Sequence, residues 1–320
     1  MRALVVLALL SGAHAFFLPA VPSVQVTNKV QKVKIDGLNV AIARTNGSCI
    51  AWIDACPHRG MSFEDALVSA GEVMCGYHGF KFDVSQNGTM THGLGCKAGC
   101  SRLTMLPVRD QDGFMWVSTD GDESIEPVTM PPQHYCKGFR TITGSTRIDC
   151  TTEQFLENVV DAIHLPLVHT FGNRKDPTPH NYTATRTTPY TGTATFKYRT
   201  SETSVFALLD KNSTFLDVFN EYRLPATVGT TVTSQNGDVK VIRAHARQDG
   251  DQTIVYWSLT RNFVAHPLFD SLARFIFLAT LSEDAVVLRK CDPMNQKGDF
   301  HNRYDALQVM RRHALRALSK

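Results

Sequence analysis

The chain has 320 residues, of which 43% are hydrophobic and 20% are charged. This composition is enough for two ordinary folded domains and is not that of a disordered chain. Its 33 basic and 30 acidic residues leave a formal net charge of only +3, so charge gives no reason to expect nucleic acid as a partner. A small-molecule substrate is therefore the default expectation.

The first fifteen residues have the pattern of a secretory signal peptide. A basic start at Arg2 is followed by a short apolar run and by Ala13-His14-Ala15, a small-x-small cleavage site. The run is too short to span a bilayer, and we find no transmembrane segment. Residues 16–27 contain no acidic side chain, which suits a transit-like extension. The Ala15-Phe16 junction resembles the bipartite presequences of algal complex plastids, and simple secretion or an endomembrane lumen is the alternative.

Residues 28–120 have the pattern of a small all-β domain. Short apolar alternations are separated by Gly, Asn and Asp, which favour turns. Acids and prolines without apolar periodicity follow from Gly121 to Gly138, so residues 121–145 are expected to form a linker. The predicted strands are Asn39–Arg44, Cys49–Asp54, Glu72–Met74, Phe80–Asp83 and Met115–Ser118.

Two Cys/His pairs lie in this domain, in the pentapeptides Cys56-Pro-His58-Arg-Gly and Cys75-Gly-Tyr-His78-Gly. Each offers one thiolate and one imidazole on a loop that ends in glycine. Two facing loops would supply a cysteine pair to one iron of a 2Fe-2S cluster and a histidine pair to the other. Imidazoles in place of thiolates raise the reduction potential. Zinc fingers also use Cys-x-His steps, but they do not usually place Pro, Gly and an aromatic residue at these positions.

The two pentapeptides resemble the cluster motifs of Rieske proteins. The resemblance implies a [2Fe-2S] cluster and a Rieske domain over residues 28–120. Neither loop has the extra cysteine of disulfide-linked respiratory Rieske subunits, and a Rieske ferredoxin would end near residue 120. Because thiolate-ligated clusters need reduced cysteines, the resemblance also favours a plastid over secretion. The implied cluster ligands are Cys56, His58, Cys75 and His78.

Two further cysteines, Cys96 and Cys100, lie in a glycine-rich run. They could form a redox pair or belong to another metal site. No His or Cys pair with zinc spacing accompanies them, so an ordinary loop is the favoured interpretation.

Residues 146–320 are expected to form an α+β domain. Thr152 is a good helix-cap residue, and Leu165-Pro166 would end the helix that it begins. Strands wrapped around a long helix can hold a pocket between sheet and helix. The predicted elements are a helix over Thr152–His164, strands between Thr183 and Asn262 with a hairpin turn at Asn236-Gly237-Asp238, and helices over Leu268–Lys290 and Arg303–Leu318.

A histidine pair lies at the end of the first of these helices. His164 and His169 flank the break at Pro166, which can turn both imidazoles toward one point. With a carboxylate from elsewhere they would complete a facial triad that leaves iron(II) three open positions. Alone, such a pair is more often structural than metal-binding.

The run from Asn158 to His169 resembles the Asn-x-x-Asp-x-x-His-x-x-x-x-His motif of Rieske oxygenases, in their monooxygenase and O-demethylase branch. The resemblance implies a helix-grip, START-like catalytic domain with an antiparallel sheet. It implies mononuclear Fe(II) bound by His164, His169 and Asp284. Glu283 is the alternative carboxylate, because neighbours on a helix point about 100° apart and only one can face the metal.

The same resemblance implies catalytic roles for Asn158 and Asp161. Asp161 is expected on the face of His164, three residues away, where it could bond to the N–H of a ligating imidazole. It would then bridge His164 to His78 of the partner subunit in a head-to-tail homotrimer. A local cap or salt bridge is the alternative.

The expected activity is O2-dependent hydroxylation or O-dealkylation of a small apolar or aromatic substrate. A ferredoxin or a flavin reductase would supply electrons, because Gly93-Leu-Gly95 is the nearest approach to a nucleotide-binding fingerprint and lacks the required strand, helix and acid. The alternative is a non-catalytic redox-sensing or electron-transfer protein, similar to the Rieske protein associated with plastid import. The substrate cannot be named, since the inward faces of the strands depend on their register.

Overall fold

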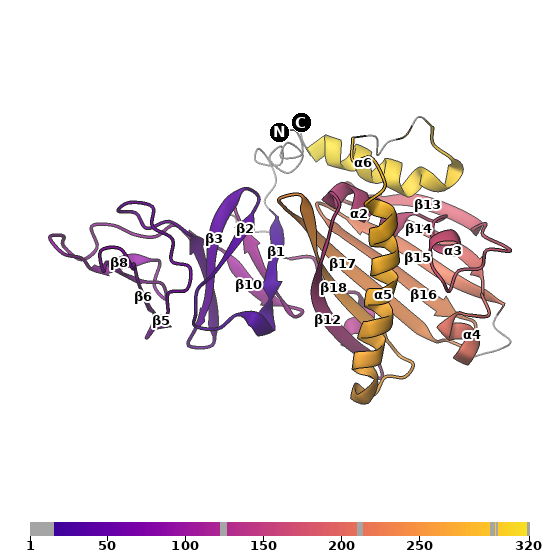
Figure 1. Cartoon of the computed structure of the whole chain (residues 1–320), viewed down its shortest axis with the longest axis horizontal. Coiled ribbons are helices and arrows are strands. Elements are labelled where there is room, and N and C mark those ends of the chain that lie inside the picture. Colours follow the sequence, from indigo (N-terminus) through magenta and orange to yellow (C-terminus); the bar gives the residue numbers. More distant parts are fainter. Residues whose placement is uncertain (1–15, 122–126, 210–213, 295–297, 299, 319–320) are drawn as a thin grey trace. The chain divides into compact units, whose positions relative to one another are not determined.

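The computed structural model describes residues 16–121, 127–209, 214–294, 298 and 300–318 (Figure 1). The chain divides into two compact units, residues 1–129 and residues 130–320. The predicted signal peptide, residues 1–15, lies outside the described residues. Within the described part of the chain, no helix is long and apolar enough to cross a membrane.

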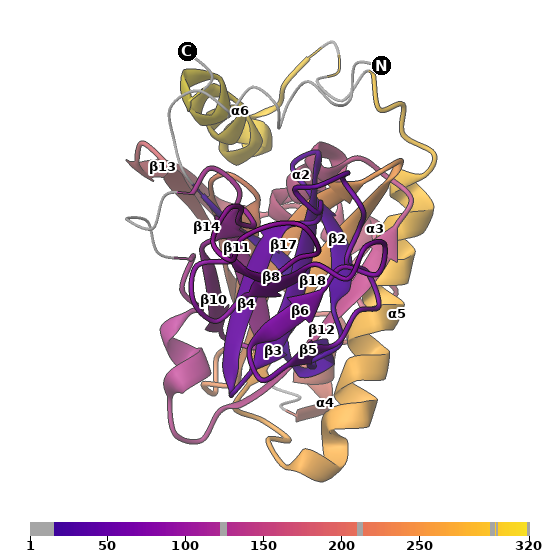
Figure 2. The same ribbon diagram turned by 90° about the vertical axis from the view of Figure 1, so that its left-hand side faces the viewer.

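The first unit consists of three small antiparallel sheets (Figures 1 and 2). Their strand orders are β1-β11-β10, β2-β3-β4-β9 and β5-β6-β7-β8. The predicted all-β domain is thereby confirmed. The strands are β1 Phe17–Pro22, β2 Gln31–Ile35, β3 Leu38–Thr45, β4 Ser48–Ile53, β5 Val68–Ser69, β6 Glu72–Met74, β7 Lys81–Asp83, β8 Thr89–His92, β9 Met105–Leu106, β10 Val108–Gln111 and β11 Phe114–Ser118, and a 3-10 turn, η1, spans Ser23–Gln25.

Strand β1 corrects the prediction that residues 16–27 are a transit-like extension. All six of its residues are buried, and it pairs with β11 from Phe17 opposite Ser118 to Pro22 opposite Phe114. Leu18 packs in the same buried cluster as the side chains of β2 and β3. Charged side chains are unfavourable in a buried strand, and this accounts for the lack of acidic residues over Phe17–Pro22.

The second unit is one seven-stranded antiparallel sheet with helices, as the predicted α+β class requires. The strand order is β12-β18-β17-β16-β15-β14-β13, and α5 runs along one face of the sheet (Figure 1). The strands are β12 Arg140–Ile148, β13 His180–Thr188, β14 Thr191–Arg199, β15 Phe215–Arg223, β16 Thr227–Ser234, β17 Val239–Asp249 and β18 Gln252–Arg261. The helices are α2 Thr152–Val160, α3 Leu165–Val168, α4 Val205–Leu209, α5 Asp270–Leu288 and α6 Ala306–Leu318, with 3-10 turns η2 Pro132–Tyr135, η3 Pro267–Phe269 and η4 Arg303–Asp305.

Two predicted boundaries in this unit were wrong. Strand β12 begins at Arg140, so the last residues of the predicted linker 121–145 belong to the sheet. Helix α2 ends at Val160, because Asp161 turns to an extended conformation with φ −69° and ψ 129°. Pro166 then lies in the first turn of α3, where a missing N–H leaves no helical hydrogen bond unmade. The proline therefore begins a helical turn and does not end the longer helix.

Helix α2 is held in place by a buried ion pair. Arg311 of α6 is 1% exposed and donates two hydrogen bonds to Glu153, at 2.6 and 3.0 Å. Burial opposes the charge on Glu153, but Arg311 outweighs it and lowers the pKa of that carboxyl group. The pair anchors the start of α2, and the chain that leaves its other end carries the two predicted iron-ligating histidines.

Candidate metal centres

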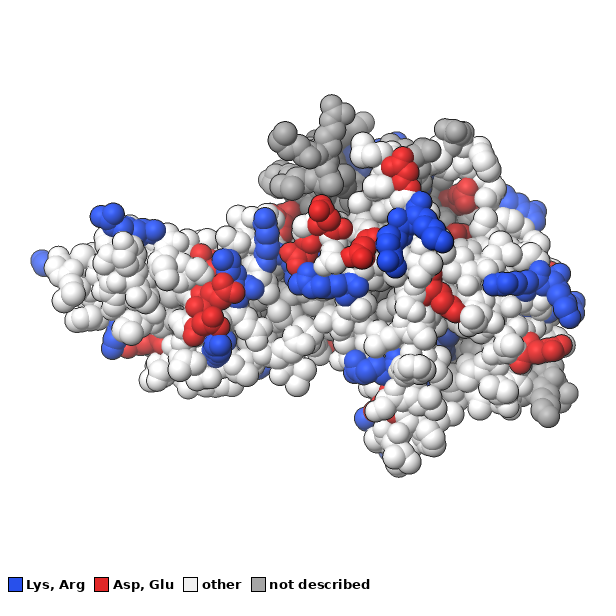
Figure 3. Space-filling model, in the orientation of Figure 1, with Lys and Arg blue, Asp and Glu red and all other residues white. Residues whose placement is uncertain are grey.

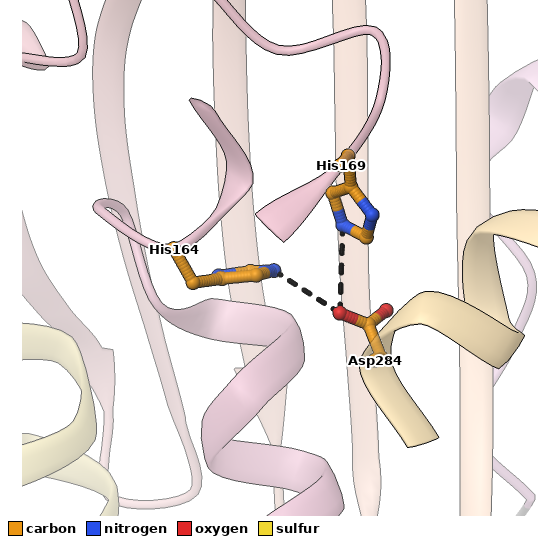
Figure 4. Close-up of side chains that lie close together, drawn as sticks. All are labelled: His164, His169 and Asp284. Carbon is orange, nitrogen blue, oxygen red and sulfur yellow. Dashed lines mark ion pairs between the residues drawn. The ribbon is translucent and has the colours of Figure 1, made fainter. Parts of the chain in front are cut away.

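Two histidines and one aspartate converge between α3 and α5 (Figure 4). His164 precedes α3, His169 follows it, and Asp284 lies on α5. The Nε2 atoms of His164 and His169 are 3.6 and 3.5 Å from the same atom, Oδ1 of Asp284. In the described residues these three side chains, here called the iron triad, are the one group of three potential ligands whose atoms lie within 4.8 Å of one another.

The burial of the triad favours a bound cation. The Asp284 side chain is 7% exposed, and its Oδ1 has no hydrogen-bond partner in the described structure. A buried carboxylate oxygen without a partner is costly unless a positive charge compensates it. Two imidazoles and one carboxylate are the donor set that non-haem iron(II) takes. The residues present therefore fit a mononuclear iron.

The second nitrogen of each imidazole is already engaged. His164 Nδ1 lies 3.2 Å from the carbonyl oxygen of Asp161, and His169 Nδ1 lies 2.8 Å from Oε2 of Glu283. Since both acceptors are oxygens, each Nδ1 carries the proton and each Nε2 keeps its lone pair for a metal. Glu283 also accepts a hydrogen bond from the Thr170 N–H at 3.3 Å.

Protonation states around the triad agree with ligation. Burial lowers the pKa of His169 and outweighs its acidic neighbours, so the imidazole is neutral, as a metal ligand must be. Burial acts to raise the pKa of Glu283, but the hydrogen bonds from His169 and Thr170 outweigh it and lower that pKa. Glu283 is therefore an anion that orients His169.

The two predicted cluster loops have the same backbone geometry. In the first, the Cys56 N–H donates to the Met61 carbonyl, and the Gly60 N–H donates to Cys56, both at 2.8 Å. In the second, Cys75 donates to Phe80 at 2.8 Å, and Gly79 donates to Cys75 at 3.0 Å. Gly60 and Gly79 have φ of 71° and 68°, a region that favours glycine. The final glycine of each pentapeptide is thus required by the turn.

The cysteines and the histidines of these two loops differ in burial. The cysteine thiols are free and buried, and burial and the neighbouring Cys75 thiol raise the pKa of Cys56. The imidazoles lie nearer to solvent, with Nδ1 of His58 3.0 Å from Nδ1 of His78. Two buried thiols and two imidazoles whose nitrogens face each other fit a cluster with mixed ligation.

Family comparisons agree with both groups of residues. Residues 16–101 match the family model described as the Rieske [2Fe-2S] domain, and residues 148–320 match the Vanillate O-demethylase oxygenase C-terminal domain. The chain belongs to the Rieske oxygenase family. Its cofactors are accordingly a [2Fe-2S] cluster and a mononuclear non-haem iron.

Individual relatives lie in the same family. The oxygenase component of dicamba O-demethylase from Stenotrophomonas maltophilia is 26% identical over 160 residues, which are 49% of this chain and 47% of that protein. Chlorophyllide a oxygenase from Chlamydomonas reinhardtii, a chloroplast protein, is 34% identical over 131 residues, or 38% and 19% of the two chains. These alignments span less than half of the length of either relative.

Solved structures of this Rieske oxygenase fold cover the chain more completely. Dicamba monooxygenase bound to 3,6-dichlorosalicylic acid aligns with a TM-score of 0.78 and 18% identity, over 95% of this chain and 96% of that one. A mutant of Pseudomonas putida NdmA with caffeine aligns with a TM-score of 0.78 and 16% identity, over 95% and 90%. At such identity the likeness establishes the fold alone.

Of Asn158 and Asp161, to which the family motif assigns catalytic roles, Asp161 is the one in contact with the triad in the described structure. The Nδ2 of Asn158 is buried and has no hydrogen-bond partner among the described residues. Asp161 and His164 do not share a helix, because α2 ends at Val160 and both residues follow it. The Oδ2 of Asp161 nevertheless lies 3.7 Å from His164 Nδ1. Its Oδ1 accepts the Ile163 N–H at 2.8 Å. The expected proximity of Asp161 to His164 is present, although it arises from a turn.

Two contacts of the triad were not anticipated from the sequence. Glu283 was expected only as the alternative ligand, whereas it bonds to His169. Phe171 stacks on the His169 ring, with centroids 5.0 Å apart and planes 8° apart. In the sequence, Phe171 could have been noticed as an aromatic residue two positions after the predicted ligand His169. Cys96 and Cys100 are exposed, and no third potential ligand joins them in the described chain.

Proposed function

We propose that the chain is the oxygenase component of a multi-component oxygenase. It would insert oxygen from O2 into a C–H or O-alkyl group of a small apolar or aromatic molecule, by hydroxylation or O-dealkylation. The observation that carries the proposal is the convergence of two imidazole Nε2 atoms on one unpartnered oxygen of Asp284. We assign the Fe(II) ligands to the iron triad of His164, His169 and Asp284, and the cluster ligands to Cys56, His58, Cys75 and His78.

The roles of the surrounding residues follow from their contacts. Bound iron(II) with three protein ligands offers open positions for oxygen and substrate. Glu283 and the Asp161 carbonyl hold the two imidazoles with Nε2 turned inward. Phe171 covers one face of the His169 ring and keeps water from that side of the ligand. These side chains would maintain the geometry of the metal ligands. The substrate would then be selected by side chains on the facing side of the seven-stranded sheet.

The first prediction concerns the cluster. Reduced, purified protein should give the anisotropic electron paramagnetic resonance signal with a low average g value that mixed His/Cys ligation produces. The physical reason is the pairing of two buried thiols with two imidazoles on matching loops. A signal typical of all-cysteine ligation, or zinc alone by elemental analysis, would contradict the assignment.

Electrons would come from a ferredoxin or a flavin reductase, because the chain contains no flavin or nicotinamide fingerprint. We further propose a homotrimer in which the cluster of one subunit serves the iron of the next. An exposed apolar stripe at the start of α5 supports an oligomer, since such surface is usually covered by a partner. In Figure 3 the lower tip of the molecule, where α5 begins, is mostly uncharged surface, with basic and acidic side chains on one flank. The stripe consists of Leu268, Leu272, Phe275 and Ile276.

The second prediction separates an oxygenase from the rival function, a redox-sensing or electron-transfer Rieske protein. With an electron donor, the loaded protein should consume O2 in a substrate-dependent manner when it is screened against phenolic ethers, sterols and tetrapyrroles. A complete triad in a chain that also carries the two cluster loops favours turnover. Reversible cluster reduction without oxygen uptake on any member of this panel would favour the rival.

For location, we propose a plastid reached through the secretory route. The chloroplast relative in Chlamydomonas reinhardtii supports a plastid, and thiolate ligation favours a compartment with cluster assembly. Cleavage after Ala15 would leave β1, which begins at Phe17, intact. A secreted or endomembrane location is the alternative.

A further inference from the structure

The glycine-rich run after β8 folds as two successive turns of the same kind, here called the double turn, over residues 93–96 and 97–100. In each turn the last residue is a cysteine, and its N–H donates to the carbonyl of the first residue at 3.3 Å. The third residues, Gly95 and Gly99, have φ of 72° and 79°, a conformation that calls for glycine at this position of a turn. The two cysteines therefore occupy equivalent positions, one turn apart.

The thiols of these cysteines, Cys96 and Cys100, are free, exposed and close to each other. Desolvation raises the pKa of Cys100, and so do the charge and the hydrogen bond of the neighbouring Cys96 thiol. The two sulfur atoms are thus within interaction distance. No third potential metal ligand joins them in the described residues. Two adjacent, accessible thiols without a metal are the reactants of a thiol–disulfide exchange.

The second turn is anchored on β8. The Gly99 N–H donates to the Met90 carbonyl at 2.8 Å, and the Met90 N–H donates to the Ser101 carbonyl at 2.9 Å. Thr89, at the start of β8, forms a bridge with Arg102. Cys100 is therefore held between two points that are hydrogen-bonded to a strand, and a bond to Cys96 would fix the first turn to the same anchor.

The first turn packs on the ring of Phe80. A Cβ added to Gly93 would lie 2.9 Å from Cδ1 of Phe80, so this position admits glycine alone without a shift of the ring. The centre of the Phe80 ring lies 4.9 Å from that of His58, and the Phe80 carbonyl accepts the Cys75 N–H at 2.8 Å. Phe80 thus separates the double turn from one cluster histidine and is bonded to one cluster cysteine.

We propose that Cys96 and Cys100 form a reversible disulfide in exchange with a thiol reductant, and that the closed form holds the double turn on Phe80 and lowers the reduction potential of the cluster. As the sulfur–sulfur bond forms, the pair gives up two electrons and two protons. A disulfide of the exchange partner takes them up as two thiols, and reduction reverses both steps.

The direction of the effect on the cluster follows from charge. Reduction adds one negative charge to the cluster, and access of water to the ligands favours the charged form. A double turn that is fixed over Phe80 limits this access on the side of His58, so the cluster should become harder to reduce. The inference goes beyond the proposed oxygenase function, because neither the disulfide nor the potential depends on turnover.

The first experiment measures the thiol state of the cluster-loaded protein in glutathione buffers of increasing oxidised-to-reduced ratio. Exposed thiols are alkylated with N-ethylmaleimide before denaturation, so that thiols freed from the cluster are not counted, and the sites are identified by peptide mass spectrometry. Cys96 and Cys100 should lose alkylation together, as one internal disulfide. At submillimolar glutathione this should occur at a ratio roughly tenfold to hundredfold lower than the ratio that adds glutathione to the exposed Cys136 and Cys291, because the second step is intramolecular.

Two reductants then distinguish the possible sources of the exchanging thiol. Reduced glutathione is a monothiol, and dithiothreitol stands for a dithiol protein. Reopening by glutathione would mark a pair that follows the glutathione pool, whereas reopening by dithiothreitol alone would mark a dithiol partner. A bond that neither reagent reopens would be a permanent crosslink and would overturn the inference.

The second experiment measures the cluster potential by spectroelectrochemistry in the closed and open forms. At one applied potential near the midpoint, the ratio of reduced to oxidised cluster should be roughly threefold or more lower in the closed form. Cys96→Ser and Cys100→Ser should both keep the potential of the open form after treatment with glutathione disulfide. Cys136→Ser is the matched control, because Cys136 is an exposed cysteine of the other unit, and it should behave as wild type.

Three further results would overturn the inference. They are alkylation of both thiols at every glutathione ratio, separate glutathione adducts on Cys96 and Cys100 in place of one disulfide, and a disulfide that leaves the cluster potential unchanged. A shift that persists in Cys96→Ser would also overturn it, since another oxidised group would then be the cause. Neither oxygen nor substrate enters these measurements, so their failure leaves the proposed function standing, and a protein without oxygen uptake leaves this inference standing.

Discussion

Asp284→Ala should lose the mononuclear iron and with it all substrate-dependent oxygen consumption, while the electron paramagnetic resonance signal of the reduced cluster stays unchanged. The reason is that Asp284 Oδ1 lies within 3.6 Å of both imidazole Nε2 atoms. His164→Ala should have the same outcome. Iron content by elemental analysis, beside the resonance spectrum and an oxygen electrode, measures all three properties.

Substitution of Glu283, the neighbouring carboxylate, should weaken iron binding less than substitution of Asp284. Glu283→Gln keeps a hydrogen-bonding oxygen beside His169 and removes the charge, so iron should bind roughly 10–100-fold more weakly, as after loss of an outer partner of a ligand. Asp217→Asn, an exposed site on β15, is the control and should keep both metals. If Asp284→Ala retains iron and activity while Glu283→Ala loses both, the third ligand has been assigned to the wrong residue.

Asp161→Asn should bind both metals but slow electron transfer from reduced cluster to iron by orders of magnitude. The Asp161 side chain is 25% exposed and its Oδ2 lies 3.7 Å from His164 Nδ1, so its carboxylate can meet an imidazole of a partner subunit. Asparagine is nearly isosteric and keeps the oxygen that accepts the Ile163 N–H. The local turn should therefore survive, and only the charged bridge is removed.

The measurement is rapid mixing of the reduced protein with oxygen and substrate, with cluster reoxidation followed optically. Sedimentation of the wild-type protein accompanies it, because a bridge between subunits requires an oligomer. Transfer at the wild-type rate in the variant would reduce Asp161 to a local capping residue. A fully active monomer would exclude the bridge altogether.

Several features were accessible from the sequence because their causes are local. The cluster loops are two pentapeptides that each begin with Cys and end with Gly, and each closes on itself through backbone hydrogen bonds. The hairpin turn at Asn236-Gly237-Asp238 could also be predicted, because Asn-Gly favours such turns. In the structure Gly237 adopts a φ of 90°. The α+β class followed from a run of strand patterns with helix patterns before and after it.

Other features depend on partners that are distant in the chain. Residues 16–27 resembled a targeting extension because their lack of acidic residues was read without β11, with which Phe17–Pro22 pairs in the fold. The end of α2 was misplaced because Pro166 suits both the end of one helix and the first turn of the next. Local pattern alone could not choose between these conformations.

The sequence by itself determined which residue types bind metal and where the turns that present them lie, because ligand spacing and glycine turns are properties of a few consecutive residues. Only the tertiary structure decided that Asp284 faces the imidazoles while Glu283 bonds to His169 Nδ1. It also decided that Lys240 approaches Phe171. These choices depend on the packing of α5 and on the register of β17. A shift of one residue would rotate the side chains of α5 by about 100° and would turn the other face of β17 toward the site.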